Sequence, residues 1–513
     1  MNGAESLVRT LIASGVDTCF SNPGTSEMHF VAALDRVAGM RSVLGLFEGV
    51  VSGAADGYAR MAGKPAATLL HCGPGLANGI ANFHNAKRAH VPIVSIVGDQ
   101  ATYHKPLDPP LAADTEALAG TVSTFVRTSR RAEDVGADAA AAVAAARGAP
   151  GSIATLILPS DASWDEGGVI AAPLAVTPPA RVEEAAIVET VRILRSGEPT
   201  LILLAGAALR GGALEDAARI AAATGAKLSG ENFITRIERG AGRPFVPRVP
   251  YPIDAALAAL AGVRRVILVG AQNPVAFFAY PGQPGHLLPP EAEVHTLARA
   301  EDDGPDALAR LADALDAPDW VPPPRAPRPA LPKGAVTSPA VAQALSALIA
   351  EGTIVVDEAL TFGFALYPNT GEAAPHDWLQ TRGGAIGDGP PLATGAAVGA
   401  PGRRVVNLEG DGSAIYTMQA LWTQARERLD VTTVIFANRR YEILFDELKN
   451  VGAAAGAASR ALFDLDDPVI DWRAIATGFG VESGRAETME QFAELFTVAN
   501  NTRGPFLIEL AVP

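Results

Sequence analysis

The chain has 513 residues, which is enough for about three domains at roughly 150 residues each. Hydrophobic residues make up 48% of it and charged residues 19%, so we expect a large buried core and exclude a disordered chain. The net charge of -15 at pH 7 excludes nucleic acid and anionic lipid surfaces as partners.

The cysteines and the N-terminal residues indicate in which cellular compartment the protein is expected. Cys19 and Cys72 lack the spacing of a zinc site or of a disulfide framework. Glu5 and Arg9 interrupt the first apolar stretch, so we predict no signal peptide. The Ala-rich run 137–149 contains charged residues and is too short to span a bilayer. We therefore expect a cytoplasmic protein without a membrane segment.

In the first third of the chain, apolar runs of strand length alternate with stretches of helical period. This alternation is typical of an α/β fold, in which helices flank a parallel sheet. Ligands bind at the carboxyl ends of strands in such sheets, so Glu48 and His71 are expected at the functional edge. Asp56 and Arg60 are four residues apart, which predicts an ion pair on a helix surface. The expected strands are 42–47, 67–70 and 92–97, and the expected helices are 50–61 and 76–88.

Two proline-containing segments divide the chain into three expected α/β domains. Prolines interrupt the pattern within 171–180, and residues 319–329 are too rich in proline for a helix or an internal strand. The expected domains are 1–170, 181–318 and 333–513, each with a parallel sheet flanked by helices. The later strands are expected at 200–205, 265–269, 353–357, 404–408, 432–437 and 506–510.

The motif Gly410-Asp411-Gly412-Ser413 directly follows one expected strand, and Asn438 ends the next, 27 residues after Asp411. A strand, a crossover helix and a second strand would bring Asp411 and Asn438 to one edge of a parallel sheet. Mg²⁺ prefers such oxygen ligands and completes its shell with phosphates, and the N-terminus of the following helix favours a phosphate. The alternative is a tight turn in which Asp411 only caps a helix.

These motifs resemble the signature of enzymes that depend on thiamine diphosphate (ThDP), and 438–444 continues it as in that family. The resemblance implies Mg²⁺ bound by Asp411, Asn438 and the carbonyl of Arg440. It implies cofactor contacts from Gly410, Gly412, Ser413 and Thr361, although a hydroxyl such as that of Thr361 at a strand end is equally often a cap. The C-terminal unit would then bind the diphosphate.

A second match lies in the N-terminal unit, which resembles the pyrimidine-binding domain of acetolactate synthase and benzoylformate decarboxylase. The segments that carry it are 21–27, 47–49, 54–60, 73–75 and Asn78. The resemblance implies that Glu48 is the acid/base group that activates the cofactor, and that Pro23, Gly24 and Asn78 contact it. Without the resemblance, Glu48 would be read as a surface residue capping a helix that starts at Gly49.

The loop 383–391 matches the place where the family puts a large aliphatic wedge beneath the bent cofactor. By resemblance Ile386 is that wedge and Gly384 contacts the cofactor. A buried core residue is the alternative for Ile386. Asp388 departs from the family, which usually has an apolar residue there.

The choice of reaction depends on proton donors. His71 matches an active-site histidine of benzoylformate decarboxylases, and Thr25 matches a substrate-binding serine of those enzymes. Their second histidine has no equivalent, since 276–282 is apolar, and Phe277 or Phe278 is expected to shape the pocket. With fewer donors the enamine survives to attack another carbonyl, so we expect decarboxylation of a pyruvate-like 2-keto acid followed by carboligation, as in acetolactate synthase.

Two alternatives stay open. One is a non-oxidative 2-keto acid decarboxylase of the benzoylformate decarboxylase type. The other is a catalytically inactive regulatory or binding subunit, which predicts the loss of Glu48, Asp411 or Asn438, and all three are present. A nicotinamide-dependent dehydrogenase is disfavoured because 22–24, after the first strand, is not the Gly-x-Gly-x-x-Gly turn that such enzymes carry.

The resemblance also concerns assembly and the central unit. It implies a homodimer or homotetramer with active sites between subunits. The central unit resembles a Rossmann-like domain that binds FAD or ADP in some members of the family, and the glycine-containing turn 204–212 does not by itself support FAD. The sequence leaves open the donor and acceptor substrates, dimer against tetramer, and any need for a regulatory subunit.

Overall fold

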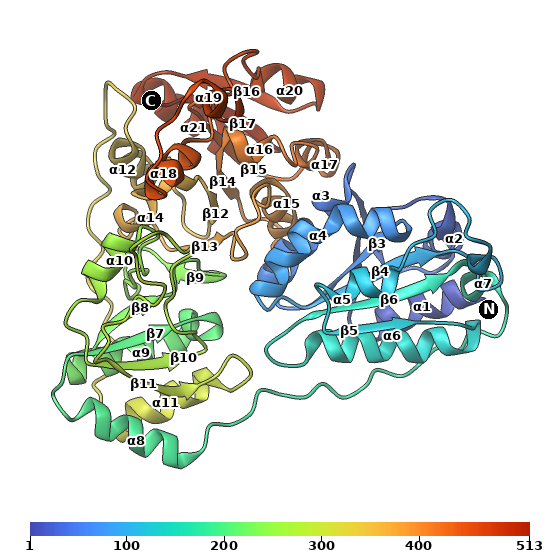
Figure 1. Cartoon of the computed structure of the whole chain (residues 1–513), viewed down its shortest axis with the longest axis horizontal. Coiled ribbons are helices and arrows are strands. Elements are labelled where there is room, and N and C mark those ends of the chain that lie inside the picture. Colours follow the sequence, from blue (N-terminus) through green and yellow to red (C-terminus); the bar gives the residue numbers. More distant parts are fainter.

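The computed structural model describes residues 1–513 and contains three sheets, each flanked by helices (Figure 1). Every named pair of neighbouring strands is parallel except β9 with β13. The α/β prediction is therefore confirmed. None of the helices combines the length and the apolar character needed to cross a bilayer.

The N-terminal sheet has six parallel strands in the order β2-β1-β3-β4-β6-β5. Its strands are β1 Thr18–Asn22, β2 Arg41–Leu44, β3 Ala66–Leu70, β4 Ile93–Asp99, β5 Phe125–Thr128 and β6 Ile153–Pro159. Its helices are α1 Gly3–Ala13, η1 Thr25–Glu27, α2 Met28–Arg36, α3 Glu48–Ala62, α4 Cys72–Arg88, η2 Lys105–Leu107, α5 Thr115–Gly120, α6 Ala132–Arg147 and α7 Ser160–Trp164.

Glu48 is not the residue directly after a strand, as the expected strand 42–47 implied, but the first residue of α3. Strand β2 stops at Leu44, and the extended backbone of Phe47 leads into the helix. Helix α4 likewise begins at Cys72, four residues before its expected start at 76. Both candidate side chains, Glu48 and His71, therefore stand at helix N-termini.

The central sheet has four parallel strands in the order β11-β10-β7-β8. Its strands are β7 Thr200–Leu204, β8 Lys227–Gly230, β10 Arg265–Val269 and β11 Glu293–Ala298. Its helices are α8 Glu184–Leu194, η3 Gly206–Leu209, α9 Gly211–Thr224, α10 Ile253–Leu260 and α11 Gly304–Ala314.

The C-terminal sheet has seven strands in the order β16-β17-β15-β14-β12-β13-β9. Its strands are β12 Ile354–Glu358, β13 His376–Gln380, β14 Val405–Gly410, β15 Val431–Ala437, β16 Glu482–Ala486, β17 Phe506–Ala511 and the edge strand β9 Arg236–Arg239. Its helices are α12 Ser338–Leu348, α13 Leu360–Gly363, α14 Leu366–Asn369, α15 Gly389–Gly399, α16 Asp411–Ala414, α17 Ala420–Glu427, α18 Glu442–Asn450, α19 Ala457–Phe463, α20 Trp472–Gly478 and α21 Met489–Asn501.

Strand β9 crosses an expected boundary. It belongs to the range 181–318 in sequence but pairs antiparallel with β13 of the C-terminal sheet. Arg236 strengthens this pairing, because its Nε lies 2.7 Å from Asp377 Oδ1. The division into three domains at the expected residues stays a prediction.

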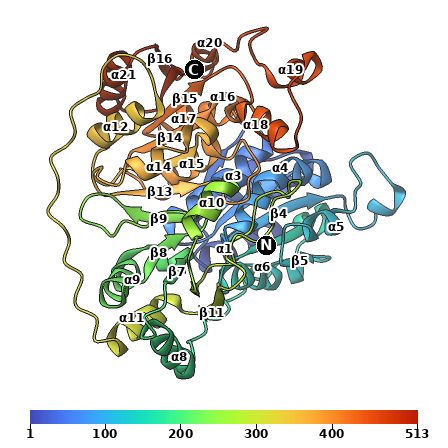
Figure 2. The same cartoon turned by 60° about the vertical axis from the view of Figure 1, so that its left-hand side comes forward.

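The two proline-containing segments are extended and contain no helix. One runs from the N-terminal unit to α8 along the lower edge of Figure 1, and the other connects α11 to α12 along the left side of Figure 2. They connect units without taking part in the cores.

Helices α3 and α15 join the N-terminal and C-terminal units through backbone contact. A Cβ added to Gly57 would lie 2.0 Å from the carbonyl oxygen of Leu392, and one added to Gly395 would lie 1.8 Å from that of Ala54. Only glycine permits this approach. The helix that starts with Glu48 is thus fixed against the helix that follows the loop of Ile386.

The predicted surface pair of Asp56 and Arg60 is wrong in its location. The pair is buried at this junction, with side-chain exposures of 0% and 1%, and its two hydrogen bonds are each 2.6 Å. Arg60 also donates to the carbonyl oxygens of Thr235 and Gln380. Packing between distant segments, which the four-residue spacing does not reveal, decides the burial.

Candidate active site

Glu48 occupies the first turn of α3 with its carboxylate near the start of α4. Its Oε2 accepts a hydrogen bond from Asn78 Nδ2 at 3.0 Å. A Cβ on Gly75 would lie 3.2 Å from Glu48 Oε1, so the small residue leaves room for the carboxylate. No cationic side chain pairs with Glu48, which leaves one of its oxygen atoms available to a ligand.

His71 lies between β3 and α4 and packs on the turn 23–25. A Cβ on Gly24 would stand 2.3 Å from the imidazole Cγ, so this turn approaches the ring closely. The ring Nδ1 is 3.0 Å from Glu27 Oε2 and 3.0 Å from Ser26 Oγ. Glu27 thereby fixes the ring orientation, and Nε2 makes no hydrogen bond within the chain.

Glu27 was not singled out from the sequence. It is 3% exposed, and it also accepts a 2.7 Å hydrogen bond from the backbone N–H of Gly24. A glutamate three residues after a helix-capping position is a recognisable spacing, and it was the available signal. Thr25, beside it, is exposed and its hydroxyl forms no hydrogen bond within the chain.

Glu27, His71 and Cys72 bring one metal-ligating atom each to within 4.8 Å of one another. The thiol is a poor ligand here, because burial raises the pKa of Cys72 to about 11 and keeps it protonated. The carboxylate of Glu27 and the imidazole of His71 are already hydrogen-bonded to each other. This group is therefore better described as a hydrogen-bonded network than as a metal centre.

The carboxylate of Asp411 lies at the carboxyl edge of the C-terminal sheet, where β14 and β15 are parallel neighbours as predicted. Its Oδ1 accepts from the backbone N–H of Gly412 at 2.9 Å, and its Oδ2 accepts from that of Arg439 at 2.7 Å. Burial raises the pKa of Asp411 to about 6, and no cationic side chain forms an ion pair with it.

Asn438 and Arg440 follow β15 in the next turn. Asn438 Oδ1 accepts from the backbone N–H of Arg440 at 3.1 Å, and the left-handed φ of 59° at Arg439 turns the chain between them. The guanidinium of Arg440 pairs with Glu442. A buried carboxylate without a cation, an amide oxygen and a neighbouring carbonyl are the hard oxygen donors that Mg²⁺ accepts, so these residues fit the ion.

The helix expected after the glycine motif is divided into two. Helix α16 contains four residues, Asp411–Ala414, and α17 begins at Ala420. Between them Thr417 donates to the carbonyl of Gly387 at 2.8 Å, which turns the chain toward the loop of Ile386. Gly412 is in contact with the ring of Tyr441, and Ser413 Oγ donates to the carbonyl of Gly410 at 3.1 Å.

The loop 383–389 is held on both sides. On one side the Glu358 carboxylate accepts the backbone N–H groups of Gly387, Asp388 and Gly389 at 2.8 to 3.1 Å. On the other side Asn82 and Asn85 of α4 donate to the carbonyls of residues 387 and 385. These contacts fix the backbone on both sides of Ile386.

Asp388 stands where the family usually has an apolar residue. It is completely buried, and burial together with the negative charge of Asp56 raises its pKa well above the usual range. Both effects favour the neutral form of this side chain. Burial likewise raises the pKa of Glu409, and the neighbouring Glu358 raises it further.

Ile386 and Gly384 line a cavity of about 490 Å³. Gly384 has a left-handed φ of 79°, and a Cβ there would lie 2.5 Å from the ring of Phe277. Both the backbone conformation and the lack of space therefore require glycine at this position. Thr361 belongs to the short helix α13 beside this cavity but is not part of its lining. Seven of the 25 residues that line it are aromatic: Phe233, Phe245, Tyr251, Phe277, Phe278, Phe364 and Tyr367.

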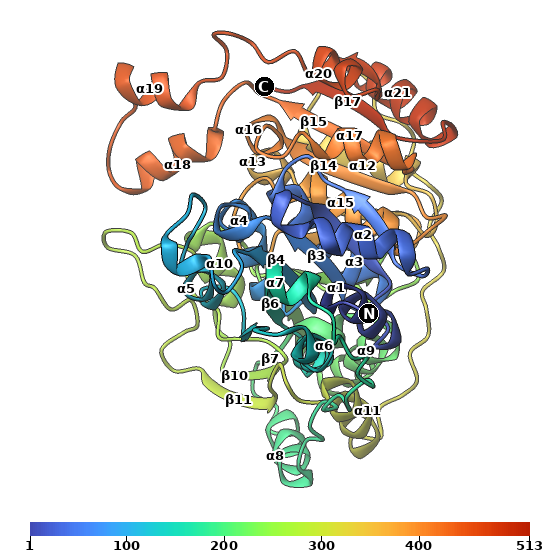
Figure 3. The same cartoon turned by 90° about the vertical axis from the view of Figure 1, so that its right-hand side faces the viewer.

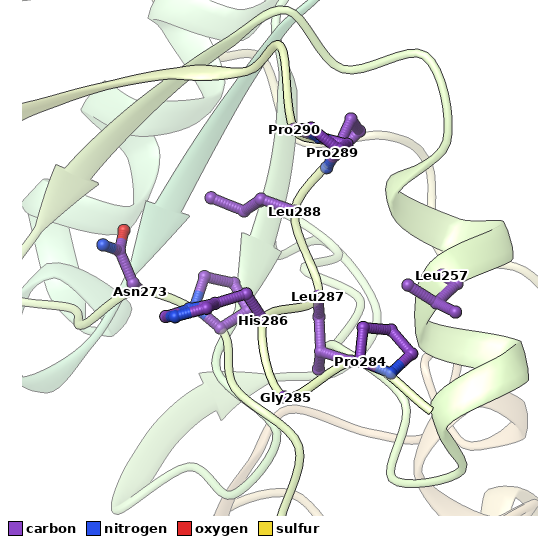
Figure 4. Close-up of a pocket in the computed structure, with 10 residues that line it drawn as sticks. Leu257, Asn273, Pro284, Gly285, His286, Leu287, Leu288, Pro289 and Pro290 are labelled. Atoms are coloured by element: carbon purple, nitrogen blue, oxygen red, sulfur yellow. The ribbon is translucent and has the colours of Figure 1, made fainter. Parts of the chain in front are cut away.

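A larger hollow of about 680 Å³ lies between α10 and the loop 284–290 (Figure 4). Its lining includes Leu257, Asn273 and His286 but no carboxylate and no guanidinium. The cavity at Ile386 is the better active-site candidate, because it combines a large apolar wall with several polar groups.

The structure brings the candidate residues together in two groups and not in one. Glu48, His71 and Thr25 gather at the edge of the N-terminal sheet, whereas Asp411 and Asn438 gather at the edge of the C-terminal sheet. None of the first group lines the cavity of Ile386 in the same chain. A single chain therefore presents two partial sites.

The fold and these two groups define an enzyme that depends on ThDP, also called thiamine pyrophosphate, and the chain belongs to the thiamine pyrophosphate enzyme family. Residues 1–118 match the N-terminal TPP binding domain of thiamine pyrophosphate enzymes, and residues 364–510 match the C-terminal TPP binding domain. The recognition made from the sequence motifs is confirmed.

Relatives cover the whole chain. The Mycobacterium tuberculosis protein named "Putative acetolactate synthase large subunit IlvX" is 53% identical, over 100% of this chain and 99% of its own length. Benzoylformate decarboxylase of Pseudomonas aeruginosa is 30% identical, over 97% and 96%. Among solved structures, the ThDP-dependent 4-hydroxybenzoylformate decarboxylase of Rhodococcus jostii RHA1 has a TM-score of 0.86 at 25% identity, covering 99% of this chain and 98% of its own.

Proposed function

We propose that the enzyme uses ThDP and Mg²⁺ to decarboxylate a 2-keto acid and joins the retained fragment to a second carbonyl compound. The aromatic wall around Ile386 is the observation that carries this choice. It includes Phe277 and Phe278 and contains no histidine, so the wall itself offers the retained fragment no imidazole as a proton donor. A fragment that is not protonated can react with another carbonyl compound.

The cofactor, when bound, supplies a nucleophilic carbon and an electron sink for decarboxylation. In the proposal Glu48 exchanges a proton with the pyrimidine ring, and Asn78 holds the Glu48 carboxylate in place. Asp411, Asn438 and the carbonyl of Arg440 hold Mg²⁺. Further cofactor contacts are assigned to Pro23, Gly24, Asn78, Thr361, Gly384, Ile386, Gly410, Gly412 and Ser413.

Substrate is assigned to Thr25 and His71. The free hydroxyl of Thr25 binds the carboxylate of the keto acid, and Nε2 of His71 holds or moves a proton at the keto oxygen. The oriented pair of Glu27 and His71 also favours a second candidate function, non-oxidative decarboxylation, because a positioned imidazole can protonate the fragment directly.

We further propose a homodimer or homotetramer in which the N-terminal group of one chain faces the cavity of its partner. The separation of the two groups in one chain supports this. Helices α18 and α19 project from the body in Figure 3 and contain no buried residue. Leu462 of α19 is 73% exposed and Val451, which follows α18, is 53% exposed, and these apolar side chains suit contact with a second copy.

The turn 204–212 lines another cavity, of about 450 Å³. Arg147, Arg210 and Arg299 also line it, and none of their guanidinium groups forms an ion pair. This charge suits an anionic ligand, and FAD remains outside the proposal. The visible absorbance of the purified protein distinguishes a flavin from a colourless nucleotide.

Purified protein with ThDP, Mg²⁺ and a panel of 2-keto acids tests the proposal, with acyloins separated from aldehydes by mass spectrometry. We expect Glu48→Gln to bind the cofactor yet turn over at least about 100-fold more slowly. Glu189→Gln, which removes a surface carboxylate paired with Arg192, serves as the matched control. Wild-type turnover by Glu48→Gln at saturating cofactor would remove Glu48 from the mechanism.

A further inference from the structure

Two guanidinium groups lie at or beside the aromatic cavity without ion pairs. Arg239 is 2% exposed and lies over the rings of Tyr367 and Trp378, 3.9 and 5.0 Å from their centroids. Its Nη2 donates to the carbonyl of Tyr367, while its Nε and Nη1 have no partner. Arg248 lines the cavity itself, 4.3 Å from the Tyr367 centroid, and its one hydrogen bond is a 3.3 Å contact with the carbonyl of Asn232.

The carboxyl groups of the same cavity do not neutralise these two charges. Glu358 is occupied by the backbone of the Ile386 loop, and Glu447 accepts hydrogen bonds from Tyr251 and Tyr280. Asp357 accepts from Trp378 Nε1 at 3.2 Å and Gln380 Nε2 at 3.0 Å, and neither arginine lies within ion-pair distance of it.

Asp357 is thus the carboxyl group whose charge acts on both guanidinium groups, and its oxygens are already hydrogen-bonded. Burial also favours the neutral form of Asp357 by raising its pKa. A buried cation without a counter-charge is costly, and an incoming anion relieves that cost. Arg248 is the group in position to receive the anion, because it lines the cavity and keeps most of its donors free.

The carboxylate next to the keto group is a poor partner for this arginine. It leaves as carbon dioxide, so a strong ion pair with it would stabilise the bound substrate more than the transition state. A group that the substrate retains throughout the reaction suits Arg248 better. Arg248 and Ile386 line this cavity together with seven aromatic residues, whose rings suit an apolar spacer.

We propose that Arg248 binds a second carboxylate at the far end of the donor substrate, so that the enzyme selects 2-keto acids with an apolar spacer and a terminal acid group. This inference rests on the proposed function and names its substrate class. Arg248 acts here as a specificity-determining residue. Arg239, which also contacts the Tyr367 ring and does not line the cavity, adds positive charge without touching the substrate.

A pair of probes that differ only in the terminal acid tests the inference: 4-carboxyphenylglyoxylate and phenylglyoxylate. For the wild-type enzyme we expect kcat/KM to favour the carboxylated probe by at least about 30-fold, as a charged hydrogen-bonded pair in a desolvated site should. Arg248→Met keeps the apolar stem and should reduce this preference to about threefold or less. Arg248→Lys should restore part of it.

Arg243→Met is the matched control, because Arg243 lies in the same segment but pairs with Glu238 away from the cavity. It should leave the preference unchanged. Calorimetry with 4-carboxyphenylglyoxylate and cofactor-free protein gives a second readout, in which wild type binds the carboxylated probe more tightly than phenylglyoxylate. This comparison of two probes on one protein keeps the inference testable even if Arg248→Met does not fold.

The outcomes separate the two proposals. Turnover of phenylglyoxylate without any preference for the carboxylated probe overturns the role of Arg248 and leaves the proposed function intact. A preference that survives in Arg248→Met also overturns it. Absence of turnover with every 2-keto acid, with ThDP bound, overturns the proposed function, and calorimetry then still decides whether Arg248 binds the acid group.

Discussion

Replacing Gly395 by alanine is expected to force helices α3 and α15 apart. The added Cβ would lie 1.8 Å from the carbonyl oxygen of Ala54 and 2.7 Å from the backbone nitrogen of Tyr58. Ordinary contact between heavy atoms is near 3.5 Å, so the helices must separate by roughly 1.5 Å at this point. Overpacking usually lowers the free energy of unfolding by about 1–3 kcal/mol. Because the atoms in the way here belong to the backbone, which cannot rotate aside as a side chain can, we expect a loss of about 3 kcal/mol or more.

Urea unfolding midpoints of wild type and variant measure this effect, since midpoints do not require a two-state extrapolation in a chain with several units. Gly212→Ala is the matched control, because a Cβ at that position in α9 meets nothing within 4 Å. It should leave the midpoint unchanged or raise it slightly. A Gly395→Ala protein that unfolds at the wild-type urea concentration would refute backbone contact between α3 and α15.

Three further results are expected. Asp411→Ala should lose Mg²⁺-dependent ThDP binding in a calorimetric titration while its melting temperature stays close to wild type; wild-type cofactor affinity would exclude Asp411 as a ligand. Burial lowers the pKa of His376 to about 3, so below its usual value of 6.5 the unfolded chain takes up a proton that the folded protein does not. Stability should therefore fall by up to about 1.4 kcal/mol per pH unit as the pH decreases from 6.5. Melting curves between pH 7 and pH 5 should show a flatter dependence for His376→Gln, and parallel curves would contradict this assignment. Glu27→Gln should lower kcat by about tenfold with unchanged ThDP affinity, because the ring of His71 loses the carboxylate that orients it; a kcat equal to that of wild type would show that Glu27 is only structural.

The sequence was most informative where the order of strands and motifs along a short stretch of chain determines where residues lie in the fold. A strand, a glycine-flanked Asp411 and a second strand ending before Asn438 leave little choice of topology, and β14 and β15 are indeed parallel neighbours. The roles of these residues stay predictions, but their meeting at one sheet edge follows from connectivity alone. The extended segments 171–180 and 319–329 could be read with the same ease, since proline restricts the backbone locally.

The sequence was least informative where distant segments meet. Arg60 was predicted on a surface, yet it donates to the carbonyl of Gln380, 320 residues away. Glu358 was not selected, although it holds three backbone groups of the Ile386 loop. Strand β9 lies in the central part of the chain and completes the C-terminal sheet. No local sequence pattern predicts such contacts, because each contact depends on where a distant part of the chain lies in the folded protein.

The contact of α3 with α15 has a consequence for an assembly in which two chains build each site. Glu48 begins α3, and the loop of Ile386 ends where α15 begins at Gly389. Each chain therefore fixes its acid/base candidate and its wedge candidate in one rigid unit, but the proposed assembly uses them in two different sites. A Gly395→Ala substitution in one chain of a mixed dimer should then reduce turnover at both sites, whereas Glu48→Gln in one chain should silence only one of them.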